Sequence, residues 1–287
     1  MRIIHCAPFN IFTKTGGALY SNAVKISNGL VRNGHFVHNY DFRDAARYYS
    51  ILKNKKNGSR KMNEKLVELI KEIDPDLVIF GHSDLIESRI YEFIYKKRIK
   101  SIFWYNDVPG PDYIQKDIQL FDAVFTTAGG EFLTEIRKLN EKSFFMPNLL
   151  DESVECYRAF ENVDFEFDVF MPARVDQERV QIKKDLETHF PNYVLKFIGD
   201  DKRNIVIGDD YFKMIASSRI VINANREFTL GYKWYTSDRL MHIIGNGAFP
   251  ISTKMIGAET FFEDKLLMYS SHEEMFEQIS RIKHGHK

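Results

Sequence analysis

An arginine and a histidine three residues apart, Arg239 and His242, mark the segment of the sequence that is most informative about chemistry. At that spacing, two side chains share one face of a predicted helix. Tyr235 and the hydroxyl residues Thr236 and Ser237 stand at the helix start, where a hydroxyl caps free backbone N–H groups. The N-terminus of a helix also attracts anions. Hydroxyls and an arginine at such a place predict a phosphate-binding site and not merely a cap.

Two more arginines, Arg174 and Arg179, stand around the start of another predicted helix, just after a strand. A guanidinium group binds phosphate oxygens through a planar fork of N–H donors, so such a pair suits a diphosphate. The alternative is a pair of surface charges, but the position at a strand end favours binding. The next strand ends in the turn formed by Gly199 and Asp200, which we assign to the same site.

In the first half of the chain, polar residues also follow predicted strands. His82 and Asp107 each stand just beyond an apolar run, with Asp84 close behind the first of them. A histidine or carboxylate there can act as a general base or bind a substrate hydroxyl, and the alternative is a structural or solvated side chain. Gly16 and Gly17 lie between the first strand and the first helix. They let backbone N–H groups approach an anionic ligand, or they form an ordinary tight turn.

The elements that must position these residues are predicted from alternating apolar patterns. The expected strands are 2–8, 35–40, 77–80, 101–105, 123–127, 167–171, 194–198, 220–223 and 248–252, and the expected helices are 18–33, 63–73, 130–139, 177–188, 211–217, 237–244 and 273–282. This alternation predicts an α/β fold of doubly wound parallel sheets, in which ligands bind beyond the carboxyl ends of the strands. The pattern weakens over 151–164 and then restarts, so we expect two Rossmann-like domains, 1–150 and 151–287.

The composition excludes several classes of protein. Lys and Arg number 40, and Asp and Glu also number 40, so no basic excess favours nucleic acid. Cys6 and Cys156 fit no metal-ligand spacing, which indicates a reducing compartment. No apolar run approaches the roughly 20 residues that span a bilayer, so we expect a cytoplasmic protein. The basic stretch 53–61, which follows Tyr48 and Tyr49, is interpreted as a solvated loop. The alternative is peripheral contact with anionic lipid at the inner face of the membrane.

On these residues, the chain resembles glycosyltransferases of the GT-B type and is most similar to the group related to spore protein CgeB. In that group an arginine is followed three residues later by a glutamate, and then by Gly-Ala-Phe before a strand. The matching segments here are Arg239, His242, Gly247-Ala248-Phe249, Asp74-Pro75-Asp76, Phe80-Gly81-His82, Trp104 to Pro109, Met146-Pro147-Asn148 and Phe197 to Asp200. Each motif alone is moderately specific, and their order along nearly the whole chain carries more weight.

The resemblance implies two Rossmann-like domains facing a central cleft, with the acceptor mostly on the first and the nucleotide-sugar donor on the second. It implies that Arg174 and Arg179 bind the donor phosphates and that no metal or other cofactor takes part. Two departures concern the donor site. His242 replaces the glutamate that commonly binds the nucleotide ribose, and Trp234 occupies the place of a second glutamate of the retaining families. Larger relatives continue beyond 273–282, so the resemblance implies a minimal or truncated chain.

The resulting interpretation is a hexosyltransferase-like enzyme that moves a sugar from a nucleotide sugar to an acceptor hydroxyl. A glycan, a lipid-linked acceptor or another cell-surface polysaccharide precursor would carry that hydroxyl. Asp107 is the candidate base if the reaction inverts the anomeric centre, and His82 positions the donor sugar if it retains it. A non-catalytic protein that binds nucleotide sugars is the main alternative, because function resides in the site and not in the fold. A sugar-nucleotide epimerase or a phosphorylase is the third.

Overall fold

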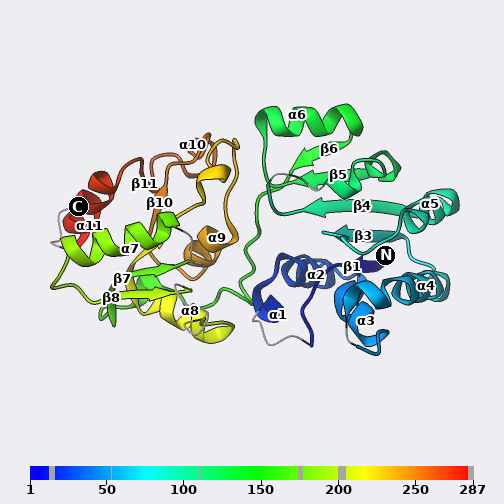
Figure 1. The fold of residues 1–287 in the computed structure, drawn as a ribbon, viewed down its shortest axis with the longest axis horizontal. Helices are drawn as coiled ribbons and strands as arrows, with labels where there is room; N and C mark the ends of the chain where they lie inside the picture. The colour runs from blue at the N-terminus through cyan, green and yellow to red at the C-terminus, as the bar shows by residue number, and fades with distance from the viewer. Residues whose placement is uncertain are drawn as a thin grey trace. The chain divides into compact units, whose positions relative to one another are not determined.

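The computed structural model of the protein describes residues 1–12, 17–52, 54–108, 110, 112–173, 177–199 and 205–283. The chain divides into two compact units, Met1–Leu149 and Leu150–Lys287, next to the boundary expected at residue 150. Each unit is built on a parallel sheet with helices packed around it (Figure 1). The predicted α/β class with doubly wound parallel sheets is confirmed.

Unit 1 contains a six-stranded sheet in the order β2-β1-β3-β4-β5-β6. Its strands are β1 Arg2–Cys6, β2 Phe36–Tyr40, β3 Leu77–Gly81, β4 Lys100–Tyr105, β5 Ala123–Thr126 and β6 Ser143–Phe145. Its helices are α1 Gly17–Tyr20, α2 Asn22–Arg32, α3 Phe42–Tyr48, α4 Lys55–Ile73, α5 Ser88–Lys97 and α6 Gly130–Leu139. Because β1 pairs with β2 on one side and β3 on the other, the direction of chain progression reverses between β1 and β3.

Aromatic side chains form much of the core beneath α3, α4 and α5. Phe42, Phe80 and Phe103 are almost completely buried in one cluster with apolar residues of these helices. The rings of Phe80 and Phe121 meet edge-on with their centroids 5.9 Å apart. Burying one such side chain contributes about 1.5–3 kcal/mol to stability. Packing on alternate strand residues therefore fixes the strands of unit 1 in register.

Unit 2 contains a five-stranded sheet in the order β11-β10-β9-β7-β8. Its strands are β7 Phe167–Pro172, β8 Leu195–Ile198, β9 Ser218–Asn223, β10 Pro250–Thr253 and β11 Leu267–Tyr269. Its helices are α7 Gln177–His189, α8 Asp209–Ala216, α9 Asp238–Gly245, α10 Glu259–Phe262 and α11 His272–Lys283. Chain progression reverses here between β7 and β9, since β7 pairs with β8 on its other side.

Two expectations for unit 1 are wrong. The helix expected over 18–33 is divided into α1 and α2, because Ser21 caps α2. The described part of the basic stretch 53–61, expected as a solvated loop, is mostly helical, because α4 begins at Lys55 with Asn54 as its cap. Gly58 explains the difference, since it allows α4 to pack directly against α3. A Cβ atom at this glycine would lie 1.8 Å from the carbonyl oxygen of Ala46. Close helix packing, which the sequence pattern does not reveal, therefore orders this segment.

Replacing Gly58 with alanine is expected to destabilise the protein, although alanine is the better helix former by about 1 kcal/mol. The new methyl group meets a backbone oxygen, and overpacking of this kind costs about 1–3 kcal/mol. Gly29→Ala in α2 is the matched control, because no neighbouring atom lies within 4 Å of its added Cβ. The control should therefore gain stability. Urea unfolding measures both variants, and equal midpoints would contradict the tight packing of α3 on α4.

A buried histidine on β1 makes unit 1 sensitive to acid. His5 Nδ1 lies 2.8 Å from Ser27 Oγ, and this hydroxyl donates to Asn39 Oδ1 at 2.7 Å. Burial lowers the pKa of His5 to about 3. The imidazole is therefore neutral in the folded protein, whereas an unfolded histidine takes up a proton near pH 6.5.

His5→Gln is expected to flatten the loss of stability in acid. Because the folded pKa lies below the unfolded one, the contribution of neutral His5 is complete above about pH 6.5 and is lost progressively as the pH falls toward 3. About two pH units below 6.5, the loss amounts to about 2.7 kcal/mol. Melting temperatures measured between about pH 7 and pH 4.5 show how steeply the stability of wild type and of the variant falls with pH. Identical slopes would show that His5 is not the responsible group.

Candidate functional site

In unit 2, two arginines converge on one backbone carbonyl at the carboxyl end of β9. Arg179, in the first turn of α7, donates to the oxygen of Ala224 from Nε and Nη2 at 3.2 and 2.7 Å. Arg239, at the second position of α9, donates to the same oxygen from Nη1 at 2.8 Å. The sheet reverses between β7 and β9. Ligands of doubly wound folds bind at this kind of position.

The positive charges of the two guanidinium groups repel each other. The pKa of Arg239 is lowered to about 10, first by burial and then by the positive charge of Arg179. Arg239 still carries its charge at neutral pH. A phosphate can accept hydrogen bonds from both guanidinium forks, so two such groups beside each other suit a diphosphate.

Buried polar side chains hold the start of α9 beside these arginines. Asn223 accepts a hydrogen bond from Ser237 Oγ at 2.8 Å and donates one to Ser252 Oγ at 2.9 Å. Arg239 Nη1 lies 3.4 Å from Asn223 Oδ1. Ser237 also accepts from the backbone N–H of Leu240 at 3.3 Å, so it caps the helix as expected. One hydroxyl thus ties α9 to β9 and fixes the position of Arg239.

Tyr269, at the end of β11, belongs to the same surroundings and is not among the residues predicted from sequence. Its ring is buried, and its hydroxyl has no hydrogen-bond partner among the described residues. Burial raises the pKa of this phenol, as does the charge of Glu178, whereas Arg239 and Arg179 lower it. A buried hydroxyl near two cations can donate a hydrogen bond to an anion. A polar residue at the carboxyl end of a strand is the signal that could have revealed it.

His242 has different partners from those of Arg239. Its Nε2 lies 3.9 Å from Glu155 Oε1, and both side chains are buried. Its ring meets Tyr211 and Phe212 edge-on, with centroids 5.7 and 5.4 Å apart. The structure therefore places His242 against α8 and the segment that begins unit 2, and a role in donor binding stays a prediction.

The other residues predicted for unit 2 differ in how much the structure describes. Tyr235 and Thr236 are buried immediately before α9. Gly199 follows β8 with a φ of 80°, a left-handed conformation that glycine adopts without strain. Arg174 and Asp200 lie outside the described residues, so the roles expected of them stay predictions.

In unit 1, the backbone just after β3 is strained. His82 and Ser83 have φ values of 61° and 65°, in a region that side-chain-bearing residues seldom adopt. Ser83 Oγ is buried and has no hydrogen-bond partner within the described part of the chain. Backbone conformations of this kind cost about 1–3 kcal/mol each and concentrate at functional sites. This turn lies at the carboxyl end of β3, beside β1, where the sheet reverses.

The two residues predicted at separate strand ends of unit 1 come together here. His82 interacts electrostatically with Asp107 and with Asp84, and it forms a hydrogen bond with the side chain of Asn106. Burial lowers the pKa of His82, as does the positive charge of Arg43, whereas the two aspartates raise it, and the net shift is downward. The imidazole is therefore neutral near pH 7, a form that can accept a proton or bind a hydroxyl.

Asp107 stands exposed just beyond β4. Its Oδ1 accepts a hydrogen bond from the backbone N–H of Val108 at 2.9 Å, which orients the carboxylate. The neighbouring Tyr105 ring meets His82 edge-on, with centroids 5.1 Å apart. An exposed, oriented carboxylate beside a neutral histidine can bind or deprotonate a hydroxyl.

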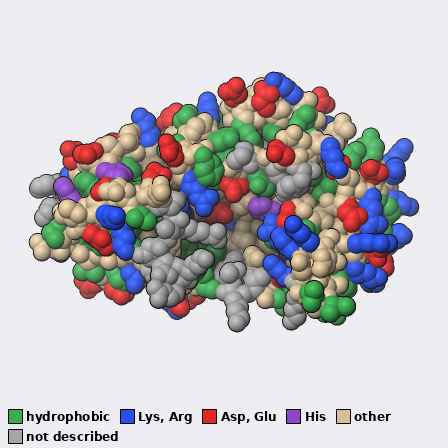
Figure 2. All heavy atoms as spheres, in the orientation of Figure 1, with side chains coloured by type: hydrophobic (Ala, Val, Ile, Leu, Met, Phe, Trp, Pro, Cys, Tyr) green, Lys and Arg blue, Asp and Glu red, His purple; other side chains and the backbone are tan. Residues whose placement is uncertain are grey.

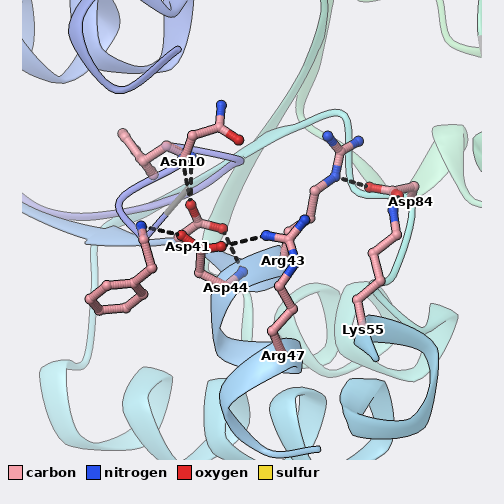
Figure 3. A network of polar contacts seen from close by, with 9 residues as sticks. Asn10, Asp41, Arg43, Asp44, Arg47, Lys55 and Asp84 are labelled. Atoms are coloured by element: carbon pink, nitrogen blue, oxygen red, sulfur yellow. Dashed lines mark hydrogen bonds and ion pairs between the residues drawn. The ribbon is translucent and has the colours of Figure 1, made fainter. Parts of the chain in front are cut away.

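A network of ion pairs fixes this edge of the sheet (Figure 3). Asp84 accepts from Arg43 Nε at 2.8 Å and from Lys55 Nζ at 3.1 Å, so one carboxylate joins the end of β3 to α3 and α4. Burial alone would raise the pKa of Asp84, but the two cations outweigh it and hold the pKa below its usual value. Two cations thus hold Asp84 in place, and its charge acts on His82.

Two further aspartates hold the loop after β1. Asp41 accepts hydrogen bonds from two backbone N–H groups of residues 9–12, and Asp44 accepts from a third, at distances of 2.7 to 2.9 Å. Figure 3 shows both carboxylates reaching from the start of α3. Gly17 is the first residue of α1, and Gly16 lies outside the described residues. The expected contact of these glycines with an anionic ligand stays a prediction.

The described residues contain neither a cluster of metal-binding side chains nor a membrane-spanning helix. No group of three or more His, Cys, Asp or Glu side chains lies close enough together there to hold a metal ion. Within the same ranges, no helix combines the length and the apolar character needed to cross a membrane.

Known proteins share the fold of this chain. Residues 175–287 match the model of the family described as glycosyl transferase-like. The fold is similar to that of an alpha-glucosyltransferase in complex with UDP and DNA, with a TM-score of 0.62 at 11% identity, over 99% of this chain and 90% of that one. A sucrose-phosphate synthase from Thermosynechococcus elongatus gives 0.61 at 11% identity, with 99% and 90% covered. The chain has the GT-B fold of glycosyltransferases.

A third GT-B structure, of the lipopolysaccharide outer core galactosyltransferase WaaB, matches with a TM-score of 0.56 at 13% identity over 99% of this chain and 91% of that one. No curated protein matches the chain. The GT-B prediction is confirmed, whereas the narrower resemblance to the CgeB group rests on the quoted motifs alone. The family match falls on the unit that contains Arg179 and Arg239.

Proposed function

We propose that this protein is a glycosyltransferase that takes its sugar from a nucleotide-sugar donor. The observation that carries the proposal is the convergence of Arg179 and Arg239 on the carbonyl of Ala224, at the reversal point of a GT-B unit. A nucleotide diphosphate supplies negative charge and oxygen acceptors that both guanidinium groups can bind. UDP is the first nucleotide to test, because the similar alpha-glucosyltransferase was solved with UDP.

The same arginines account for the chemistry at the donor. When the bond between the sugar and the diphosphate breaks, negative charge grows on the phosphate oxygens. Guanidinium groups already held in place stabilise that charge more in the transition state than in the bound donor, and this difference lowers the barrier. Tyr269 adds a donor hydroxyl beside them. Because the protein itself supplies the cations, we propose that the reaction is metal-independent and needs no other cofactor.

We propose that unit 1 binds the acceptor. If the reaction inverts the anomeric centre, the exposed Asp107 removes the proton of the acceptor hydroxyl. If it retains the centre, neutral His82 hydrogen-bonds the donor sugar. We propose a carbohydrate or lipid-linked acceptor of polysaccharide biosynthesis and a cytoplasmic location. The balanced charge of the chain gives no general attraction to nucleic acid, and its two cysteines are free.

A non-catalytic protein that binds nucleotide sugars is the second candidate. One observation favours it: His242, at the place of the ribose-binding glutamate, is buried against Glu155. Both candidates predict nucleotide binding, and they differ in whether nucleotide diphosphate is released when acceptor is added.

The first experiment is a thermal-shift panel with UDP, GDP, CMP, dTDP and their common sugar conjugates. A ligand that binds only the folded state stabilises it by about 2.7 kcal/mol at 100 times its dissociation constant, which a melting curve resolves. A clear shift with one nucleotide identifies the donor class, and acceptor-dependent release of that nucleotide then establishes transfer. Cooperative melting with no shift for any ligand would contradict the proposal.

A further inference from the structure

Three apolar side chains stand almost fully exposed at the turn between α3 and α4, and we call them the apolar tip. Tyr48, Ile51 and Leu52 have exposed fractions of 80%, 102% and 80%. Ser50 Oγ accepts a hydrogen bond from the backbone N–H of Asn54 at 3.2 Å, so the turn that presents them is closed. A group of exposed apolar side chains marks a contact surface, whereas scattered single ones do not.

Cations adjoin the apolar tip. Between Asp44 and Glu64 the chain contains six basic residues and no acidic one. Lys56, Arg60 and Lys61 are exposed on the first turns of α4, and the ammonium group of Lys56 has no ion pair among the described residues. In Figure 2, Lys and Arg side chains gather over the part of unit 1 where Figure 1 draws α4, with hydrophobic side chains at the lower edge beneath α3.

An anionic lipid surface fits this combination better than a folded partner does. Apolar side chains enter the boundary between headgroups and acyl chains, while neighbouring cations remain at the level of the phosphates. A stable protein interface buries about 800 Å² on each partner, far more than three side chains provide. A lipid surface requires no such extended complementary area.

The apolar tip is also close to the candidate site of unit 1. Lys55 follows Leu52 by three residues, and such a segment spans at most about 10 Å. The Lys55 ammonium donates to Asp84 at 3.1 Å, and Asp84 follows His82 by two residues in the chain. A membrane that holds the apolar tip would therefore be linked through Lys55 and Asp84 to the turn that carries His82.

We propose that the α3–α4 turn docks unit 1 on an anionic membrane surface. Ile51 and Leu52 enter the apolar boundary, and Lys56 and Arg60 bind lipid phosphates. The docking needs no catalysis. Docking would also imply that the acceptor resides at the membrane, and that implication rests on the proposed function.

Vesicle flotation of the full chain tests the docking. Wild type is expected to bind phosphatidylcholine vesicles that contain about a third phosphatidylglycerol at least tenfold more tightly than pure phosphatidylcholine vesicles, and less tightly in high salt. The double variant Ile51→Ser/Leu52→Ser should lose at least tenfold in affinity, and Lys56→Glu about fivefold. Val163→Ser, which replaces an apolar side chain that is 86% exposed in unit 2, is the control and should bind as wild type does.

Wild type that fails to float with anionic vesicles, or a serine double variant that floats equally well, overturns the proposal. A second measurement places a polarity-sensitive dye on Ile51→Cys in a Cys156→Ser background, since Cys6 is buried. Anionic vesicles should shift its emission to the blue, and an unchanged spectrum overturns insertion. The docking variants should keep the wild-type thermal response to UDP, so a failure of docking and a failure of nucleotide binding are distinguishable.

Discussion

Arg239→Ala is expected to weaken UDP binding about 10- to 100-fold, because a hydrogen bond to a charged group contributes about 1.5–3 kcal/mol. The same change should leave the free protein about as stable as wild type. Ala224 keeps its two hydrogen bonds from Arg179, Asn223 keeps its bond from Ser237, and the repulsion that lowers the Arg239 pKa disappears. A residue that binds ligand and contributes little to the free fold is the signature of a binding site.

Melting curves with and without UDP measure both halves of this expectation. Lys184→Ala is the matched control, because this cation is exposed on α7, the helix that also contains Arg179. It should respond to UDP as wild type does. If Arg239→Ala melts far below wild type and yet keeps its UDP-induced shift, the arginine serves the fold and the phosphate site lies elsewhere.

Asp107→Asn is expected to lower kcat about 100-fold or more if Asp107 is the general base, because general-base catalysis contributes about 10²–10⁴-fold. The amide keeps the shape of the side chain and cannot take up the proton. UDP binding should not change, since Arg179 and Arg239 lie in unit 2. Steady-state release of UDP measures kcat, and the thermal shift measures binding.

Asp112→Asn, an exposed acid in the same segment, is the control and should leave kcat unchanged. The anomeric configuration of the product, determined by NMR, decides how the result is interpreted. A retained configuration with normal kcat in Asp107→Asn contradicts the role of base and directs attention to His82. Because the pKa of His82 is lowered, the imidazole stays neutral above about pH 6.5 and should cause no change in rate there. The rate should fall when the pH drops through the lowered pKa and the imidazole takes up a proton.

Most of the alternating strands and helices of both units could be predicted from the sequence because buried parallel strands are continuous apolar runs. The short elements β6, β11, α3 and α10 are not among those expected. α5 could also have been predicted, since Ile90, Tyr91 and Ile94 are buried on one helical face. The start of α4 could not. Its sequence is polar and contains Gly58, and only contact with Ala46 across two helices explains why it is ordered.

Some residues of the candidate site could be predicted from the sequence and others could not. Arg179, Arg239 and Ser237 could be predicted because strand ends and helix starts restrict where a phosphate can bind. The carbonyl oxygen of Ala224, to which both arginines donate, could not be predicted, because every residue type has the same backbone carbonyl. In the sequence, Tyr269 looks like an aromatic residue of the core. It becomes a candidate binding residue only when the charged groups around its hydroxyl are known.

The shared carbonyl has a consequence for how this site can evolve. Every residue type supplies the same main-chain oxygen at position 224, so the bonds to the arginines place no demand on that side chain, which is restricted only by packing in the core. Substitutions reach the anion site through the arginines and through the side chains that position them, such as Ser237. Among homologous sequences we therefore expect positions 179 and 239 to be retained or lost together, while the residue at position 224 follows the packing of the core and not the presence of the arginines.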